Sequence, residues 1–87
     1  MNAKKEERIE EVCDVIISFL GEKKSEKFWA REIADAIELE VERRFPKVIT
    51  ITANSPILSK ALKKLEEDGR VRKEYSPSKD ADVYWID

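Results

Sequence analysis

The stretch at residues 55–72, SPILSKALKKLEEDGRVR, constrains the fold most, because it marks both ends of one amphipathic helix. Ser55 is a residue type that caps a first helical turn through its hydroxyl. Pro56 suits the first helical position, where its missing N–H would have had no partner. Gly69 is placed to end the helix, since glycine enters the left-handed conformation without a steric penalty. The pattern predicts a helix over residues 55–68.

This predicted helix has two different faces. Its apolar side chains recur at three- and four-residue steps and form a stripe that must be buried: Ile57, Leu58, Ala61, Leu62 and Leu65. The opposite side carries short polar and cationic groups: Ser59, Lys60, Lys63 and Lys64. With Asn54 and Ser55 at its tip, the helix therefore presents polar and positively charged groups outward.

The pattern S-x-x-x-S-K-A-L-K-K-L-E-E-D-G, followed by R-V-R-K-E-Y, resembles the recognition helix and first wing strand of winged helix-turn-helix proteins. Residues 28–37, FWAREIADAI, resemble the short strand and second helix of the same family. The resemblance implies an α+β fold with three helices and a C-terminal β-hairpin wing, in one domain spanning residues 1–87. The segment FPKVITITAN before Ser55 is longer than the family's usual turn.

The remaining elements are predicted from apolar spacing and residue type. Helical spacing indicates a first helix at residues 4–20, with Gly21 as its stop, and a second helix at residues 30–44 that ends before Pro46. β-Branched and aromatic residues favour extended segments at residues 48–52, 71–75 and 83–86, the last two forming a hairpin around a loop at residues 76–82.

Charge is distributed unevenly along the chain, although the net charge is only −2. Residues 1–40 carry −4 and residues 65–87 carry −3, whereas residues 41–64 carry six Lys or Arg against Glu42 alone, which gives +5. A local positive field attracts phosphates even on an acidic protein. The alternative is a solvated charged surface, since Lys/Glu-rich compositions are also typical of thermophiles. The clustering favours a binding surface.

Several functional classes lack support in the sequence. There is no histidine, no glycine-rich phosphate loop with its lysine and no nucleophile with a visible base, so we expect no enzymatic activity, no cofactor and no metal. No long apolar run or signal-peptide pattern is present, which favours a cytoplasmic setting. Cys13, the single cysteine, excludes a disulfide within one chain and fits the buried face of the first helix.

The function these patterns favour is sequence-specific binding of double-stranded DNA by a small transcription regulator, with the helix at residues 55–68 in the major groove. The candidates for contacts with base edges are Asn54, Ser55, Ser59 and Lys60. The candidates for contacts with phosphates are Arg43, Arg44, Lys47, Thr52, Lys63, Lys64 and Lys79.

The rival function is a winged-helix module that binds another protein in transcription, replication or membrane-remodelling machinery. The same scaffold serves both purposes, so fold alone does not decide between them. The acidic flanks favour the rival, as does the predicted wing loop, where Lys79 stands beside Asp80 and near Asp82. The positive segment at residues 41–64 favours DNA.

Other patterns each have two interpretations. Val15 and Phe19 widen the apolar stripe of the first helix, either to pack under a loop or to pair two copies in a homodimer. Thr50 and Thr52 lie in a segment that either fills the core with its isoleucines or touches the DNA backbone. The aromatic rings of Tyr84 and Trp85 serve the core or stack on bases, and the core is favoured.

Overall fold

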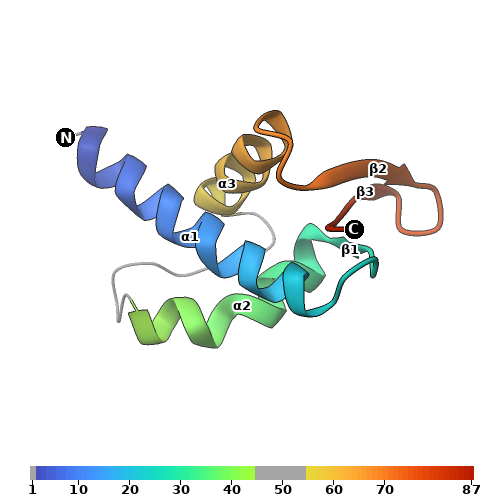
Figure 1. Cartoon of the computed structure of the whole chain (residues 1–87), viewed down its shortest axis with the longest axis horizontal. Coiled ribbons are helices and arrows are strands. Elements are labelled where there is room, and N and C mark those ends of the chain that lie inside the picture. The colour runs from blue at the N-terminus through green and yellow to red at the C-terminus, as the bar shows by residue number, and fades with distance from the viewer. Residues whose placement is uncertain (1, 45–54) are drawn as a thin grey trace.

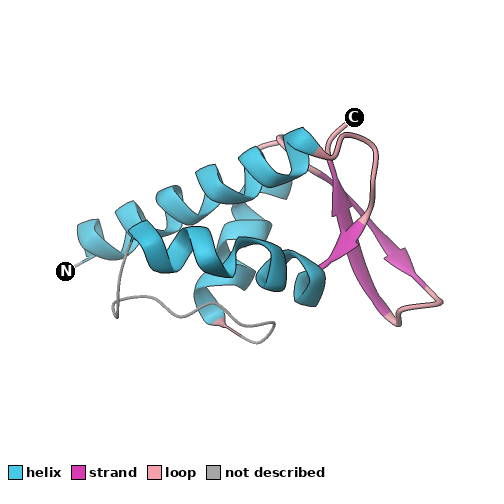
Figure 2. Cartoon of the chain, turned by 90° about the horizontal axis from the view of Figure 1, so that it is seen from below, coloured by secondary structure: helices cyan, strands magenta, loops and turns pink. Residues whose placement is uncertain are grey.

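The structure, a computed structural model, describes residues 2–44 and 55–87, with side chains from residue 8 onward in those ranges. Within them lie three helices and three strands, in the order α1 (Asn2–Glu22), β1 (Phe28–Trp29), α2 (Ala30–Arg44), α3 (Pro56–Glu67), β2 (Arg72–Ser76) and β3 (Ala81–Trp85). The helices pack together and the sheet lies at one end of them (Figures 1 and 2). The expected α+β arrangement of three helices and a C-terminal hairpin is confirmed.

The sheet is antiparallel and has the strand order β1-β3-β2, so the last strand is the central one. Tyr84 of β3 lies between two neighbours, opposite Phe28 of β1 and opposite Lys73 of β2. The short β1 therefore joins the hairpin to the chain entering α2. This pairing fixes the position of the hairpin relative to the helices.

One apolar core lies among the three helices and reaches one face of the sheet. The stripes predicted from helical spacing supply it, because each helix turns its apolar side inward. Its largest fully buried side chains are Val12, Ile16 and Leu20 from α1, Ile33, Ile37 and Val41 from α2, and Leu58 and Leu65 from α3. Leu62, also expected in the stripe of α3, is 2% exposed.

The ends of the helices differ in part from expectation. The prediction that Gly21 stops the first helix was wrong, because α1 continues through it to Glu22. The chain reverses instead at Ser25, which has a φ of 71° and donates its N–H to the carbonyl of Ile86 at 2.7 Å. Gly69 has a φ of +74°, as its predicted role after α3 requires.

Ser55 occupies the N-cap position of α3, as predicted, but without the predicted side-chain cap. Its carbonyl oxygen accepts the N–H groups of Leu58 and Ser59, at 3.1 and 3.2 Å. Pro56 fills the first helical position, where no donor is needed. The backbone of Ser55 and the ring of Pro56 thus define this helix start.

The second helix has the predicted bounds, whereas both hairpin strands are shifted. Val71, predicted as the first strand residue, precedes β2 and is buried in the core instead. The pairing of Ser76 with Ala81 shortens the predicted loop to a turn at residues 77–80. The extended segment predicted at residues 48–52 lies outside the described residues.

Candidate nucleic-acid interface

The outward face of α3 carries two lysines that have no ion-pair partner among the described residues. Because Leu58, Leu62 and the rest of the stripe face the core, Ser59, Lys60 and Lys63 are exposed on the other side. Neither Lys60 nor Lys63 forms an ion pair with another residue that the structure describes. Their ammonium groups are therefore available to an anionic partner.

The two arginines at the end of α2 are already paired. Arg43 lies 2.5 Å from Glu40, and Arg44 lies 2.8 Å from Glu40 and 3.3 Å from Glu11 of α1. Hydrogen bonds from Arg43 and Arg44 lower the pKa of Glu40, and the hydrogen bond to Glu40 raises the pKa of Arg44. A phosphate would have to compete with these carboxylates for both guanidinium groups.

Two lysines predicted to bind phosphates are also held by carboxylates. Lys64 Nζ lies 2.9 Å from Glu10 Oε1 of α1, and this hydrogen bond is the main cause of its raised pKa. Lys79 Nζ, in the hairpin turn, lies 2.5 Å from Glu32 Oε1 of α2. The structure thus separates Lys60 and Lys63 from the other described candidate cations, which it pairs with acidic groups.

The remaining predicted contact residues precede α3 in the sequence. Asn54, Thr52 and Lys47 lie outside the described residues, as does Thr50. Ser55 is partly buried at the N-cap, one turn before Ser59. Of the predicted contacts to base edges, Ser59 and Lys60 are the two on the exposed helix surface.

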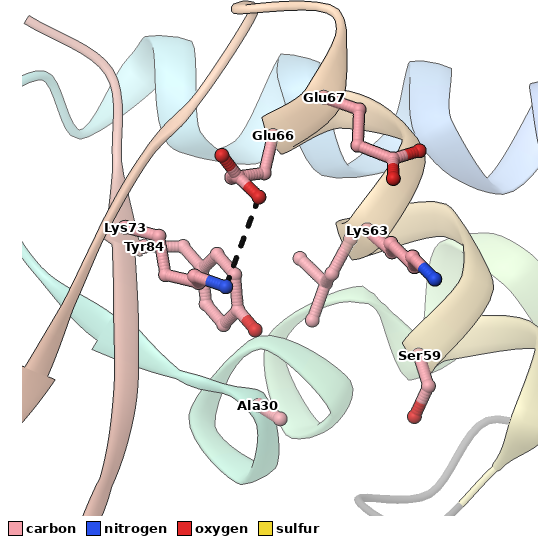
Figure 3. Close-up of a pocket in the computed structure, with 8 residues that line it drawn as sticks. Ala30, Ser59, Lys63, Glu66, Glu67, Lys73 and Tyr84 are labelled. Atoms are coloured by element: carbon pink, nitrogen blue, oxygen red, sulfur yellow. Dashed lines mark ion pairs between the residues drawn. The ribbon is translucent and has the colours of Figure 1, made fainter.

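A groove of about 290 Å³ runs between α3 and the hairpin (Figure 3). Ser59 and Lys63 stand on its α3 side, and Lys73 and Tyr84 on its hairpin side. The other residues that line it are Ala30, Leu62, Glu66 and Glu67. Lys73 Nζ approaches Glu66 Oε1 at 3.7 Å, which is the ion pair drawn in Figure 3.

Sequence reasoning did not include Lys73 among the site residues, and it assigned Tyr84 only to the core or to base stacking. Tyr84 does pack against the core cluster, so the favoured core interpretation is confirmed. Its hydroxyl forms no hydrogen bond with another described residue, and burial raises the pKa of this phenol. The observation that brings these two residues into the candidate site is the pairing of β2 with β3, which puts Lys73 directly opposite Tyr84.

Trp85 lies outside the central core cluster, so the core interpretation does not extend to it. Its ring is partly buried, and Lys27 Nζ lies 4.5 Å from the ring centroid. Lys27 is also 3.2 Å from Glu74. This cation–π contact occupies the surface that base stacking would need.

The first helix offers less apolar surface for pairing than its sequence indicated. Val15 is 3% exposed and belongs to the core, so it does not form an outward edge. Phe19 is partly buried, with its ring centroid 4.9 Å from that of Phe28. Packing within one chain therefore accounts for both side chains, and a homodimer paired through α1 stays a prediction.

Comparison with protein-family models, curated proteins and solved structures found no match for this chain. Within residues 2–44 and 55–87, no helix has the length and apolar character needed to cross a membrane. Nor do the Cys, Asp and Glu side chains in the described part of the chain form a group that could hold a metal ion. The candidate site is thus defined by its own geometry.

Proposed function

We propose that this protein binds double-stranded DNA in a sequence-specific manner, as a small cytoplasmic transcription regulator of the winged-helix class. The observation that carries the proposal is the pair Lys60 and Lys63, beside Ser59 on the exposed face of α3, neither of which forms an ion pair with another described residue. A lysine without a carboxylate partner breaks no ion pair when it binds a phosphate. The counterions that leave the nucleic acid then favour binding.

The order of elements supports this class. A helix, a short strand, two further helices and a hairpin follow one another, and the short strand pairs with the last strand. In this arrangement α3 has its buried stripe against the other helices and its polar face in solvent. A helix exposed in this way can enter the major groove, whose width admits it.

The roles follow from position and chemistry. Ser59 and Lys60, in the first two turns of α3, would reach base edges, with lysine suited to the acceptors of guanine. Lys63 would contact a phosphate, one turn further along the helix. Arg43, Arg44 and Lys64 would contribute after exchanging their carboxylate partners for phosphates.

The test is fluorescence anisotropy on a pool of random duplexes over a range of salt concentrations. Lys63→Ala should weaken binding to all sequences alike and reduce the salt slope by about one unit. Lys27→Ala is the matched control, because it removes an exposed lysine that lies over Trp85 rather than on α3. Equal effects of the two changes, or no wild-type binding at low salt, would contradict the proposal.

Sequence specificity needs its own measurement on a selected duplex. Ser59→Ala or Lys60→Ala should alter preference at one or two positions, at a cost of about 1 to 3 kcal/mol per lost base contact. Selection from random duplexes, repeated with each variant, gives the preferred bases. A uniform loss across all duplexes would assign these residues to phosphate contacts instead.

A protein-binding module is the second candidate, and the outer face of α2 favours it. Leu39 is 79% exposed there, with Asp35, Glu38 and Glu42 exposed on the same helix. An apolar side chain among acidic ones suits a partner surface that is basic with an apolar pocket. Amide-shift mapping separates the two functions, since DNA should perturb α3 and a protein partner should perturb the surroundings of Leu39.

A further inference from the structure

We infer that the groove between α3 and the β2–β3 hairpin binds a phosphate group of the nucleic-acid backbone, with Lys73 and the hydroxyl of Tyr84 as its hairpin-side ligands. This inference rests on the proposed function and deepens it, because it assigns a second contact surface outside α3. Neither residue belongs to the helix that carries the positive face described above.

The groove has donors on both sides. Its lining includes a lysine and a hydroxyl-bearing residue on each side, which are Lys63 and Ser59 from α3 and Lys73 and Tyr84 from the hairpin. In Figure 3 the ammonium group of Lys63 points away from the hairpin, so Lys73 and Tyr84 are the donors that face α3. Side chains of this kind are the usual partners of phosphate oxygens. Leu62 is 2% exposed and forms part of the lining, which gives the groove a rigid, well-packed support.

The hairpin turn is poorly suited to bind a phosphate. We therefore expect the contact between the hairpin and a phosphate near the start of β2. Lys79, the cation of the turn, is held by Glu32, and the neighbouring Asp80 accepts a hydrogen bond from the hydroxyl of Tyr75. Lys73 lies at the other end of the same strand pair, opposite Tyr84 and facing α3. The hairpin therefore contacts the nucleic-acid backbone through residues at its base rather than through its turn.

Glu66 is the internal competitor for Lys73. Their 3.7 Å separation is long, and the two side chains are 41% and 40% exposed, so the ion pair is weak. A backbone phosphodiester carries the same single negative charge as this carboxylate, and its pairing with the ammonium group also releases counterions condensed on the nucleic acid, which favours the exchange. Entry of a phosphate would displace Glu66 and leave the rest of the groove in place.

Tyr84 is suited to donate to the phosphate. Its ring packs against the core and pairs through its strand with both neighbours, so the hydroxyl is held in position. A tyrosine phenol is protonated at neutral pH, and burial raises the pKa of Tyr84 further in the same direction. The hydroxyl thus adds a neutral donor on the hairpin side of the groove, where Lys73 is the cross-strand partner of Tyr84.

The experiment measures binding of random duplexes by anisotropy, with variants that separate charge from hydrogen bonding. Lys73→Ala should weaken binding and reduce the salt slope by about one unit. Tyr84→Phe should weaken binding roughly tenfold, as expected for loss of a hydrogen bond to a charged group, and leave the slope unchanged. Glu66→Gln should tighten binding, because it removes the competing carboxylate.

The matched control is Tyr75→Phe. Tyr75 belongs to the same hairpin and is 55% exposed, but its hydroxyl donates to Asp80 and does not line the groove. This change should leave duplex affinity as in the wild type. Thermal unfolding of every variant shows whether a loss of binding reflects a loss of fold.

A second arm distinguishes the source of the phosphate. Inorganic phosphate, titrated without DNA, should leave the ring resonances of Tyr84 unchanged, whereas a duplex should shift them. Shifts with inorganic phosphate alone would support the phosphate groove but reassign it to free phosphate groups. If the wild type binds duplexes and Lys73→Ala and Tyr84→Phe bind them with the wild-type affinity, the groove is not a phosphate site, while the proposed function stands. If no duplex binds and neither probe perturbs Tyr84, both are overturned.

Discussion

Lys79 Nζ lies 2.5 Å from Glu32 Oε1, which ties the turn of the β2–β3 hairpin to the first turn of α2. The same carboxylate oxygen accepts the backbone N–H of Trp29 at 3.1 Å, as the glutamate of a capping box does. One side chain thus fixes both a helix start and the hairpin turn. The contact also limits the freedom of Lys79 to reach a phosphate.

The double role of Glu32 predicts unequal effects of removing the two partners. Glu32→Ala should destabilise the fold by roughly 0.5 to 2 kcal/mol, because the cap and the ion pair are both lost. Lys79→Ala should cost about 0 to 1 kcal/mol, as is usual for a solvent-exposed pair. Urea unfolding at neutral pH measures both values. Equal losses would show that the cap contributes nothing.

The same contact predicts a pH dependence. The hydrogen bond from Lys79 is the main cause that holds the pKa of Glu32 below its ordinary value of 4.5, and the N–H of Trp29 acts in the same direction. The folded state therefore binds this proton less readily than the unfolded state does. The resulting stability is present above pH 4.5 and is lost as pH falls through the folded pKa. The stability difference between wild type and Lys79→Ala should shrink over that range, and a difference that persists at lower pH would contradict the linkage.

Leu62 and Leu39 form a matched pair for testing the orientation of the helices. Leu62 is 2% exposed and Leu39 is 79% exposed. Leu62→Ala should cost roughly 2 to 5 kcal/mol, because truncation leaves a cavity in the core. Leu39→Ala should stay within about 0.5 kcal/mol of the wild type. Unfolding midpoints in urea decide this, and a wild-type midpoint for Leu62→Ala would mean that α3 does not face the core.

Glu10 should restrain DNA binding through Lys64, which it holds at 2.9 Å. Glu10→Gln should raise duplex affinity in the wild type, because Lys64 no longer has to exchange one anion for another. The increase should vanish in a Lys64→Ala background, as a double-mutant cycle would show. Asp14→Asn is the control, since it removes the same charge from the same exposed side of α1. An equal increase in duplex affinity from Asp14→Asn would show that the effect of Glu10→Gln comes from the change in net charge and not from the release of Lys64.

Cys13 should react only when the protein unfolds. It is 1% exposed, its thiol donates to the carbonyl of Ala61 at 3.6 Å, and burial raises its pKa to about 11. Because the thiolate is the nucleophile, a thiol reagent at about pH 8 should modify the native protein slowly and the urea-unfolded protein quickly. Rapid native labelling would show that α1 and α3 separate readily around this thiol.

The sequence determined the elements whose signals are local. Helical spacing gave the bounds of α2 and the buried stripe of α3, and Gly69 marked the end of α3 through its left-handed backbone. These signals act over a few residues, because helix period and backbone sterics are properties of the local chain. Gly21 shows their limit. A glycine is permitted in a final helical turn as well as after it, and the reversal was made at Ser25, which bonds to the distant Ile86.

Tertiary structure alone decided which charges are available. In the sequence, Lys63 and Lys64 are equivalent neighbours in one basic helix, yet α1 brings Glu10 to Lys64 and leaves Lys63 without an ion pair to a described residue. The groove arose in the same way, since hairpin register set Lys73 opposite Tyr84 and packing placed both beside α3. The physical reason is that an ion pair or a groove depends on distances between side chains of different elements, and these are fixed by packing rather than by the period of any one element.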